Sequence, residues 1–565
     1  MDKATKERYQ QWLKAETLED GLRKELEAMD DEKQVTDAFY KDLEFGTGGI
    51  RGIIGVGSAR INVHTVERTT QGYAEYLNSH HRAPAVAIAR DSRLNGLLYS
   101  EAAAKVLAAN GIKVWMFPEP CPSPVLAYAV RYLGCSGGII ITASHNPSQY
   151  NGYKVDSPEG GSISVQTAEE ISRHIAKTDI FKGIKRMTLD EASPEGLFKY
   201  IGDDVAASYL KTVSKESLLH DGDGDKDLRI IYTPLNGTGL EYVTRCLDLN
   251  GYKAIRVVEE QAEPDGNFPT CPYPNPEKRE ALEMGLRDLK TYNGDLLLAT
   301  DPDSDRIGAA VRDGDGFRLF TGNEIGVLLL DYIAKRRIAL ETFPEQPVAV
   351  KSIVSTDMAF KVADEYGIEL REVPTGSKYI GEQIQRLEAE GHPERFLLGF
   401  EESYGYLIGT YIQDKDGVNG ALAIADMAAF YKKQGKSLLD VMNELYGRHG
   451  RRIDTLYSFA FPGAEGMERM KTIMSEARKS LPARLCGEKV VTVKDFLFPP
   501  SMTDGSTLTA PKSDMLKLIT ASGTSVILRP SGTEPKLKLY LSVTGSHEQE
   551  QRLKKEIVSL FSLGS

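Results

Sequence analysis

The sequence Gly137-Gly138-Ile139-Ile140-Ile141-Thr142-Ala143-Ser144-His145-Asn146-Pro147 is a β-branched apolar run that ends abruptly in small and polar residues. Short apolar runs are typical of buried strands in parallel sheets, and open α/β sheets bind ligands beyond the carboxyl ends of their strands. We therefore expect Ser144 to be held, exposed, at a strand end. The same design, an apolar run followed by a polar loop, occurs three more times along the chain.

The three later runs lead into different chemical groups. Before and between the runs, strand-like and helix-like segments alternate, as in the strand 85–89, the helix 100–110 and the strand 113–117, a spacing typical of βαβ units. Residues 5–45 have the pattern of an amphipathic helix. We predict an α/β protein of four domains around one cleft, domains I to IV, with the bounds 1–205, 206–322, 323–450 and 451–565. The later runs and their loops are 295–300 before 301–306, 395–400 before 401–405, and 524–528 before 529–535.

Composition indicates a globular protein of the cytoplasm. Of 565 residues, 41% are hydrophobic and 27% charged, and the net charge of −12 argues against binding to nucleic acid or to an anionic membrane. The first residues have no apolar core typical of a signal peptide, and no uninterrupted apolar 18-residue run occurs. Five scattered cysteines without a Cys-x-x-Cys pair are typical of reduced thiols. We expect a cytoplasmic, multidomain protein.

The second loop carries three aspartates, Asp301, Asp303 and Asp305. Carboxylates this close repel one another unless a cation neutralises them, and oxygen ligands suit Mg²⁺ or Ca²⁺. An EF-hand is excluded, because its sixth and twelfth positions would be Arg306 and Arg312. A solvated acidic turn is the alternative. We favour Mg²⁺, with Arg306 placed to meet an anion beside it.

The other loops suit a phosphorylated sugar. Arg529-Pro530-Ser531-Gly532-Thr533 offers a guanidinium fork, hydroxyls and a glycine for an anion, although Ser-Gly-Thr also forms ordinary turns. Glu401 and Ser403 offer an acceptor and a donor for a polyhydroxy ligand, with a plain surface turn as the alternative.

Ser144 is not in a Gly-x-Ser-x-Gly nucleophile elbow. Beside a divalent cation, with His145 and Lys154 close in sequence, it suits a phosphoryl carrier. Taken alone, His145 is more simply a structural loop histidine. Near the start, residues 45–52 are rich in glycine around Arg51 but lack the third glycine of a dinucleotide fingerprint, so they favour close approach of an anion.

Together these motifs resemble a known family. Thr142–Pro147, Asp301–Arg306, Glu401–Gly405 and Arg529–Thr533 occur in the order found in the α-D-phosphohexomutase superfamily, across nearly the whole chain. Residues 45–52 are most similar to the phosphoglucomutase/phosphopentomutase branch. The resemblance implies a heart-shaped arrangement of three similar mixed α/β domains and a C-terminal α+β domain related to the TATA-binding-protein fold.

The resemblance also implies roles for individual residues. Ser144 is then the phosphorylated residue, and Asp301, Asp303 and Asp305 hold one Mg²⁺ with a phosphoserine oxygen. The sugar is contacted by Thr375, Gly376, Glu401, Ser403 and Lys415. The non-reacting phosphate is held by Arg529, Ser531, Gly532 and Thr533. The transferring phosphoryl group is surrounded by Arg51, His145, Lys154 and Arg306.

The reaction implied is reversible conversion of a sugar 1-phosphate to the 6-phosphate, of glucose above all, through glucose 1,6-bisphosphate. His145 and Lys415 are both open as the general base. Ser377, where animal-type members have tryptophan, and residues 534–538, closer to the glucosamine and pentose branches, leave pentose, mannose and glucosamine phosphates as alternatives. A metal-dependent phosphatase and a sugar-phosphate-binding regulator are the rivals of other classes. We expect sugar phosphates as the only partners, and a monomer or small homo-oligomer.

Overall fold

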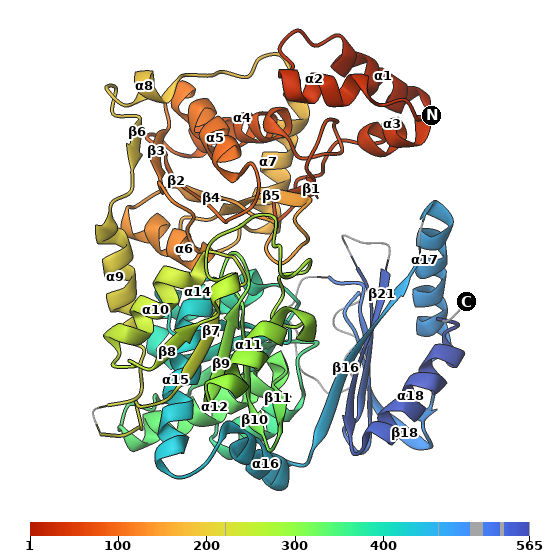
Figure 1. Ribbon diagram of the computed structural model, residues 1–565. Coiled ribbons are helices and arrows are strands. Elements are labelled where there is room, and N and C mark those ends of the chain that lie inside the picture. The colour runs from red at the N-terminus through yellow and green to blue at the C-terminus, as the bar shows by residue number, and fades with distance from the viewer. Residues whose placement is uncertain (221, 462, 498–511, 532–535, 564–565) are drawn as a thin grey trace.

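Within the described residues, four β-sheets follow one another along the chain and organise the structure (Figure 1). The computed structural model describes residues 1–220, 222–461, 463–497, 512–531 and 536–563, with only the backbone of 463–465. We keep the names domain I to IV for the units built on these sheets. Domain I lies at the top of Figure 1, domains II and III at the lower left and domain IV at the right. Within the described residues, no helix is long and apolar enough to cross a membrane.

The N-terminal residues form three short helices, so the single helix expected over 5–45 is wrong. The side chains of Asp2 and Asp31 accept hydrogen bonds from the backbone N–H groups of Thr5 and Lys33, and each caps the start of a new helix. Separate helices allow Trp12 and Phe39 to meet edge to face, with 5.8 Å between ring centroids. The helices are α1 (Lys3–Leu13), α2 (Asp20–Glu27) and α3 (Glu32–Phe39).

Domain I has a mixed sheet in the order β1-β5-β4-β2-β3-β6. The strands β2, β3, β4 and β6 are parallel, but β5 runs antiparallel to both β4 and β1. Helices α4, α5 and α7 cover one face, and α6 and α9 the other. The bounds are β1 (Ile50–Ile53), β2 (Ala85–Arg90), β3 (Lys113–Met116), β4 (Gly137–Ile141), β5 (Tyr150–Asp156) and β6 (Phe198–Tyr200), with α4 (Val63–His80), α5 (Gly96–Ala109), α6 (Ser123–Tyr132), α7 (Val165–Lys177), α8 (Leu189–Ala192) and α9 (Asp203–Ser214).

Domains II and III have smaller mixed sheets, in the orders β11-β10-β9-β7-β8 and β13-β12-β14-β15. The boundary predicted at 205/206 falls within α9, and that at 322/323 falls at the first residue of α12. Domain II contains β7 (Ile230–Thr233), α10 (Gly239–Leu249), β8 (Ile255–Val257), η1 (Glu259–Gln261), α11 (Arg279–Thr291), β9 (Leu296–Thr300), β10 (Ile307–Asp313) and β11 (Gly316–Leu319). Domain III contains α12 (Gly322–Ala339), β12 (Val348–Ser352), α13 (Met358–Glu365), β13 (Glu369–Val373), α14 (Ser377–Ala389), η2 (Pro393–Arg395), β14 (Phe396–Glu401), β15 (Gly405–Leu407), α15 (Gly417–Lys433) and α16 (Leu438–His449).

Domain IV is an antiparallel sheet in the order β16-β21-β20-β19-β18-β17, with two helices on its outer side (Figure 1). This is the α+β layout expected for the C-terminal domain. The elements are β16 (Arg452–Ala460), α17 (Gly463–Lys479), β17 (Arg484–Leu485), β18 (Glu488–Asp495), β19 (Leu516–Thr520), β20 (Ser525–Pro530), β21 (Lys536–Thr544) and α18 (His547–Leu560).

Domains I, II and III repeat one supersecondary element. In each, a buried parallel strand (β4, β9 or β14) leads through a short loop into an antiparallel partner (β5, β10 or β15). Each loop contains one residue in the left-handed region, with φ of 51° at Ser144, 55° at Ser304 and 67° at Tyr404. The expected apolar runs of domains I to III are therefore strands. In each, the polar loop is a short connection between two antiparallel strands rather than an open strand end.

Candidate active site

Ser144 lies in the loop between β4 and β5. Its side chain is buried, with the residue 3% exposed, so the expectation of an exposed serine is wrong. Asp301 of domain II, in the loop after β9, contacts it directly, together with residues of domain I. The Ser144 hydroxyl donates a hydrogen bond to Asp301 Oδ2 at 2.9 Å and lies 3.2 Å from His145 Nδ1. The structure thus brings the serine and the acidic loop, 157 residues apart, into contact.

The three aspartates after β9 form one cluster, Asp301, Asp303 and Asp305. One carboxylate oxygen of each lies within 4.8 Å of the others, and all three residues are buried. Among the described residues, Oδ1 of Asp303 and Oδ1 of Asp305 have no hydrogen-bond donor. Buried carboxylate oxygens without partners are costly, and a hard divalent cation is the partner that such an oxygen set fits. The residues present therefore fit a Mg²⁺ site.

Two lysines from other domains flank this cluster. Lys154, on β5 of domain I, donates to Asp303 Oδ2 at 2.9 Å, and Lys415, just before α15 of domain III, lies 3.0 Å from Asp305 Oδ2. Ser123 of α6 also donates to Asp303 Oδ2, at 3.2 Å. Three domains therefore supply charge to one small volume.

The pKa shifts follow this arrangement. Burial, and then the neighbouring Asp303 and Asp305, raise the pKa of Asp301 well above its usual range. Burial acts the same way on Asp303, but the ammonium of Lys154, a hydrogen bond with Asp301 and the charge of Lys415 together outweigh it and hold the pKa of Asp303 far below its usual range. A cation would favour the charged form of every carboxylate here.

His145 and Lys415 differ in the protonation state that their surroundings favour. Burial, followed by the guanidinium groups of Arg306 and Arg51, lowers the pKa of His145 well below its usual value, which favours the neutral imidazole. Burial opposes charge on Lys415 as well, but Asp305, Glu401 and Asp414 together outweigh it and the pKa of Lys415 is raised, which favours the ammonium.

Two arginines border the serine and metal loops. Arg51 on β1 donates to Asn146 Oδ1 at 2.9 Å. Arg306 donates to Glu277 Oε1 at 2.7 Å, while its Nε lies 3.9 Å from Asp301 Oδ2 and 3.8 Å from Asp305 Oδ1. The Nε of Arg306 is buried and has no hydrogen-bond acceptor among the described residues. Both guanidinium groups also act electrostatically on His145, the residue next to Ser144.

The predicted sugar residues come from domain III. The backbone N–H of Gly376, whose φ is 126°, donates to Glu401 Oε1 at 2.8 Å, and this ties the loop before α14 to the end of β14. The hydroxyl of Thr375 is buried without a hydrogen-bond partner in the described part of the chain. Ser403 lies in the tight loop between β14 and β15. Electrostatically, Glu401 acts on Lys415 and Arg306, which links this group to the metal loop.

The predicted phosphate loop follows β20 of domain IV. Arg529 is still within the strand, and its charge acts on Tyr379 of α14 and Tyr540 of β21. The Ser531 N–H donates to the carbonyl oxygen of Lys536 at 2.8 Å, which closes the loop. Gly532 and Thr533 lie outside the described residues.

Sequence reasoning missed three residues that hold the serine loop: Asp91, Arg93 and Thr142. It also missed Glu277, which pairs with Arg306. Asp91 and Arg93 belong to Arg90-Asp91-Ser92-Arg93, a polar group that directly follows the apolar strand 85–89. That is the same signal that marked Ser144, an apolar run ending in a polar loop, and it could have identified them.

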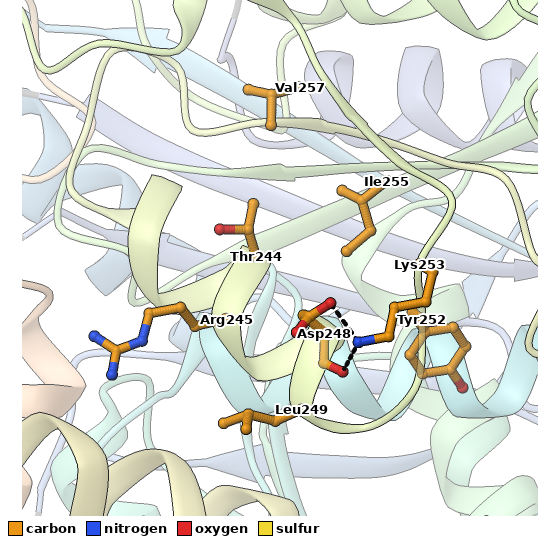
Figure 2. Close-up of a pocket in the computed structure, with 8 residues that line it drawn as sticks. All are labelled: Thr244, Arg245, Asp248, Leu249, Tyr252, Lys253, Ile255 and Val257. Atoms are coloured by element: carbon orange, nitrogen blue, oxygen red, sulfur yellow. Dashed lines mark hydrogen bonds and ion pairs between the residues drawn. The ribbon is translucent and has the colours of Figure 1, made fainter.

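Two hollows lie apart from these residues. One, of about 480 Å³, is on domain II between α10 and β8 (Figure 2), where Lys253 pairs with Asp248. The other, of about 430 Å³, lies between domains I and III beside α14. Neither is lined by any of the predicted site residues.

Comparison with known proteins matches the four-domain organisation. Models of the alpha/beta/alpha domains I, II and III of phosphoglucomutase/phosphomannomutase match residues 42–181, 207–314 and 321–449, and the model of the C-terminal domain matches 476–560. A phosphoglucomutase of Staphylococcus epidermidis is 33% identical over 543 residues, covering 95% of this chain and 96% of that protein.

Solved structures share the fold. A putative phosphomannomutase from Thermus thermophilus superposes with a TM-score of 0.70 at 21% identity, over 92% of this chain and 99% of that one. The phosphoglucomutase parafusin from Paramecium, in an open form, gives a TM-score of 0.68 at 19% identity, over 93% and 96% of the two chains.

Proposed function

Because the chain belongs to the phosphoglucomutase/phosphomannomutase family, we propose that it interconverts glucose 1-phosphate and glucose 6-phosphate through phosphorylated Ser144. It is an isomerase of the mutase type, an intramolecular phosphotransferase. The observation that carries the proposal is the contact of Ser144 Oγ with Asp301, inside a cluster of three carboxylates and Lys154. A hydroxyl in that setting is placed to carry a phosphoryl group beside a divalent cation.

In the proposed reaction, phosphoserine 144 gives its phosphoryl group to the free hydroxyl of a sugar monophosphate. The P–O bond to Ser144 Oγ breaks, a P–O bond to the sugar oxygen forms, and the sugar hydroxyl loses its proton to a base. The product of this step is glucose 1,6-bisphosphate, which then reverses its orientation in the site. Its other phosphoryl group then returns to Ser144, which restores the phosphoenzyme.

This chain's own charges do most of the work. Phosphoryl transfer is accelerated mainly by positioning and by neutralising charge on the phosphoryl oxygens. Lys154, Arg51 and Arg306 are the cations beside Ser144, and Asp301, Asp303 and Asp305 would hold Mg²⁺. When bound there, Mg²⁺ supplies Lewis-acid polarisation of the phosphoryl oxygens.

Protonation state ranks the two proposed bases. The lowered pKa of His145 favours the neutral imidazole, which can accept a proton, and its Nδ1 lies 3.2 Å from Ser144 Oγ, within the reacting group. Lys415 Nζ is bound to Asp305 at 3.0 Å, on the metal side of the cluster. We therefore assign the proton to His145 and place Lys415, with Thr375, Gly376, Glu401 and Ser403, at the sugar.

The remaining phosphate is assigned to domain IV. Arg529 offers a bidentate fork, and Ser531 with Gly532 and Thr533 completes the loop that we expect to bind it. Holding one phosphate there while the other reacts requires that the sugar bind in two orientations. Closure of this loop over the sugar would also exclude water from the phosphoserine.

The first test replaces Ser144 by alanine. We expect kcat with glucose 1-phosphate and trace glucose 1,6-bisphosphate to fall by at least about 1,000-fold, since the covalent carrier is lost. The half-buried Ser148 of the same loop provides the matched control, and S148A should keep its activity. Near-normal turnover of S144A would refute the carrier role.

The metal assignment is tested by Asp303→Asn. Removing one charge from the cluster should lower activity by about 100-fold or more and raise the Mg²⁺ concentration needed after treatment with EDTA, because fewer charged ligands bind the cation less tightly. Asp313→Asn, at the exposed end of β10, is the control. Full activity of D303N with an unchanged Mg²⁺ requirement would contradict the metal site.

Substrate identity is the next question. Comparing kcat/KM for glucose, ribose, mannose and glucosamine phosphates separates a phosphoglucomutase from a phosphopentomutase, phosphomannomutase or phosphoglucosamine mutase. Stoichiometric release of inorganic phosphate would indicate a phosphatase instead. Intact-protein mass before and after incubation with bisphosphate would reveal a mere sugar-phosphate binder, since only a carrier gains a phosphoryl group. We further propose a cytoplasmic enzyme, a monomer or small homo-oligomer.

A further inference from the structure

We propose that Arg93 is a positioning residue for phosphoryl transfer, one that fixes the backbone of Ser144 and so aims its hydroxyl at the metal loop. The inference rests on the proposed role of Ser144 as phosphoryl carrier. Arg93 follows β2 and its side chain is completely buried, although it carries a permanent charge. A buried guanidinium is costly unless its donors are used. Its Nε has no hydrogen-bond acceptor among the described residues and only the charge of Asp91 nearby, so the partners of its two terminal nitrogens reveal its purpose.

All of the partners of its terminal nitrogens are carbonyl oxygens of the serine loop. Nη1 donates to the carbonyl oxygens of Pro147 at 2.8 Å and Tyr150 at 2.9 Å. Nη2 donates to the carbonyl oxygens of Ser144 and Asn146. One side chain therefore ties four peptide groups of residues 144–150 into a single arc.

The other side of the Ser144 backbone is fixed through Asp91. The Ser144 N–H donates to Thr142 Oγ1 at 2.8 Å, and that hydroxyl donates to Asp91 Oδ2 at 2.5 Å. Asp91 Oδ2 in turn lies 3.2 Å from Arg93 Nε. The buried Asp91–Arg93 pair thus binds the C=O of Ser144 directly through Arg93, and its N–H indirectly through the Thr142 hydroxyl on Asp91.

This clamp has strain to hold. Ser144 has a φ of 51°, in the left-handed region that is unfavourable for a residue with a side chain, and such conformations persist only where their surroundings impose them. Without the two anchors, the loop would relax and turn Ser144 Oγ away from Asp301.

Domain II completes the clamp from outside. The ring of Phe268 lies 5.0 Å from the Arg93 guanidinium. A Cβ on nearby Gly266 would be only 2.6 Å from the N atom of Leu94 and from the carbonyl oxygen of Ser92, so the segment of domain II around Gly266 is in close backbone contact with residues 92–94 of domain I. The Asp91–Arg93 pair of domain I, which positions Ser144, is therefore covered by domain II, the domain that also supplies the three aspartates of the cluster.

The test compares Arg93→Lys with a matched control. Arg90, at the end of the same strand, is also buried and also donates to carbonyl oxygens, those of Phe117 and Pro118, which lie outside the serine loop. A lysine can bind only part of either set. Both variants should lose similar thermal stability.

We expect R93K to lower kcat by about 100-fold with a KM for glucose 1-phosphate within about threefold of the wild type, since a misplacement of about 1 Å at the reacting atom has an effect of that size. R90K should keep kcat within about twofold. R93K should also accept the phosphoryl group from glucose 1,6-bisphosphate more slowly, as followed by intact mass. Equal kcat values for R93K and R90K would overturn the inference.

Thr142 gives a second test that does not depend on how well R93K folds. Thr142→Val removes the hydroxyl that binds the Ser144 N–H, whereas Thr142→Ser retains it. We expect T142V to lose kcat at constant KM and T142S to regain most of it. Identical kcat for the two variants would contradict the clamp. A wild-type protein that neither turns over glucose 1-phosphate nor becomes phosphorylated would instead refute the proposed function.

Discussion

Domains I, II and III are joined by apolar packing, whereas domain IV is joined to domain III largely by charge. One continuous cluster of buried side chains runs from the β2–β4 region of domain I through β7 and β9 into α15 of domain III. Between domains III and IV, by contrast, a small cluster contains Ile353, Val354, Phe496, Met515, Ile527 and Tyr540. Separating the first three domains would expose a large apolar surface to water, which is strongly unfavourable.

The joint to domain IV contains a group of five charged residues, of which Lys351, Asp357 and Lys517 are buried and Glu372 and Lys494 are half-buried. Lys517 of β19 donates to Asp357 Oδ1 at 2.8 Å and to Glu372 Oε1 at 3.2 Å, and Lys351 of β12 lies 3.0 Å from Glu372 Oε1. Lys494 of β18 is 3.3 Å from Glu372 Oε2. Burial opposes ionisation of Glu372, but Lys351 and Lys517 outweigh it and lower its pKa. When such a joint opens, hydration of the charged groups compensates for the ion pairs that are broken. The joint to domain IV is therefore the one suited to opening.

The largest effect on this comparison is expected from Lys517→Met. It leaves Asp357 and Glu372 buried with less compensation, and breaking a buried ion pair costs about 3–5 kcal/mol. The loss should appear as easier separation of domain IV. Hydrogen exchange should rise in β18–β20 and along β12–β13 while β7 and β9 stay protected.

Lys471→Met is the control for this change. Lys471, on α17 of the same domain, is 71% exposed and pairs with the exposed Glu468, so the effect should be below about 1 kcal/mol. A uniform increase in exchange through domains I to III would show that the ionic group supports the whole fold rather than one joint.

The second prediction concerns Asp426, a charged group on the apolar side of the comparison. It lies on α15, accepts hydrogen bonds from Ser217 Oγ and Tyr252 OH, both at 2.6 Å, and burial raises its pKa from 3.8 to about 6. Between these values the folded state binds more protons than the unfolded state. Its contribution to stability is thus present at low pH and falls as the pH rises through 6, by about 3 kcal/mol in total.

Asp426→Asn should remove that slope. Unfolding by denaturant at a series of pH values from 4 to 7 should show a flatter profile for D426N than for the wild type, with the variant relatively more stable at pH 7. Asp364→Asn, at an exposed position on α13, should leave the profile unchanged. If D426N keeps the full wild-type slope, burial of Asp426 does not set its pKa.

Much of the site could be predicted from sequence because its loops are local. Ser144 and the three aspartates follow short apolar runs, and those runs are strands. The burial of Ser144 could not be predicted, because Asp301, to which its hydroxyl donates, comes from another domain and is 157 residues away. Arg93 follows an apolar strand, so its position was open to prediction, but its role was not: its partners are backbone carbonyl oxygens, which carry no sequence signal. Likewise, the sequence alone suggests that Lys351, within an apolar strand, faces solvent. Its burial is explained only by the contacts that Asp357, Glu372 and Lys517 make around it in the folded protein.

The smallest predicted effect tests both joints with the same substitution. Ile424, on α15, belongs to the apolar cluster shared by domains I to III, and Ile527, on β20, belongs to the small cluster beneath domain IV. Each Ile→Val change removes one buried methylene and should cost about 1 kcal/mol. If the comparison is right, I424V lowers the unfolding free energy of the unit formed by domains I to III, while I527V raises hydrogen exchange only in domain IV and at its contacts with β12. The two variants control for each other, since their chemistry is identical. Matching exchange patterns would mean that all four domains unfold as one unit, and the distinction between an apolar and an ionic joint would then carry no dynamic consequence.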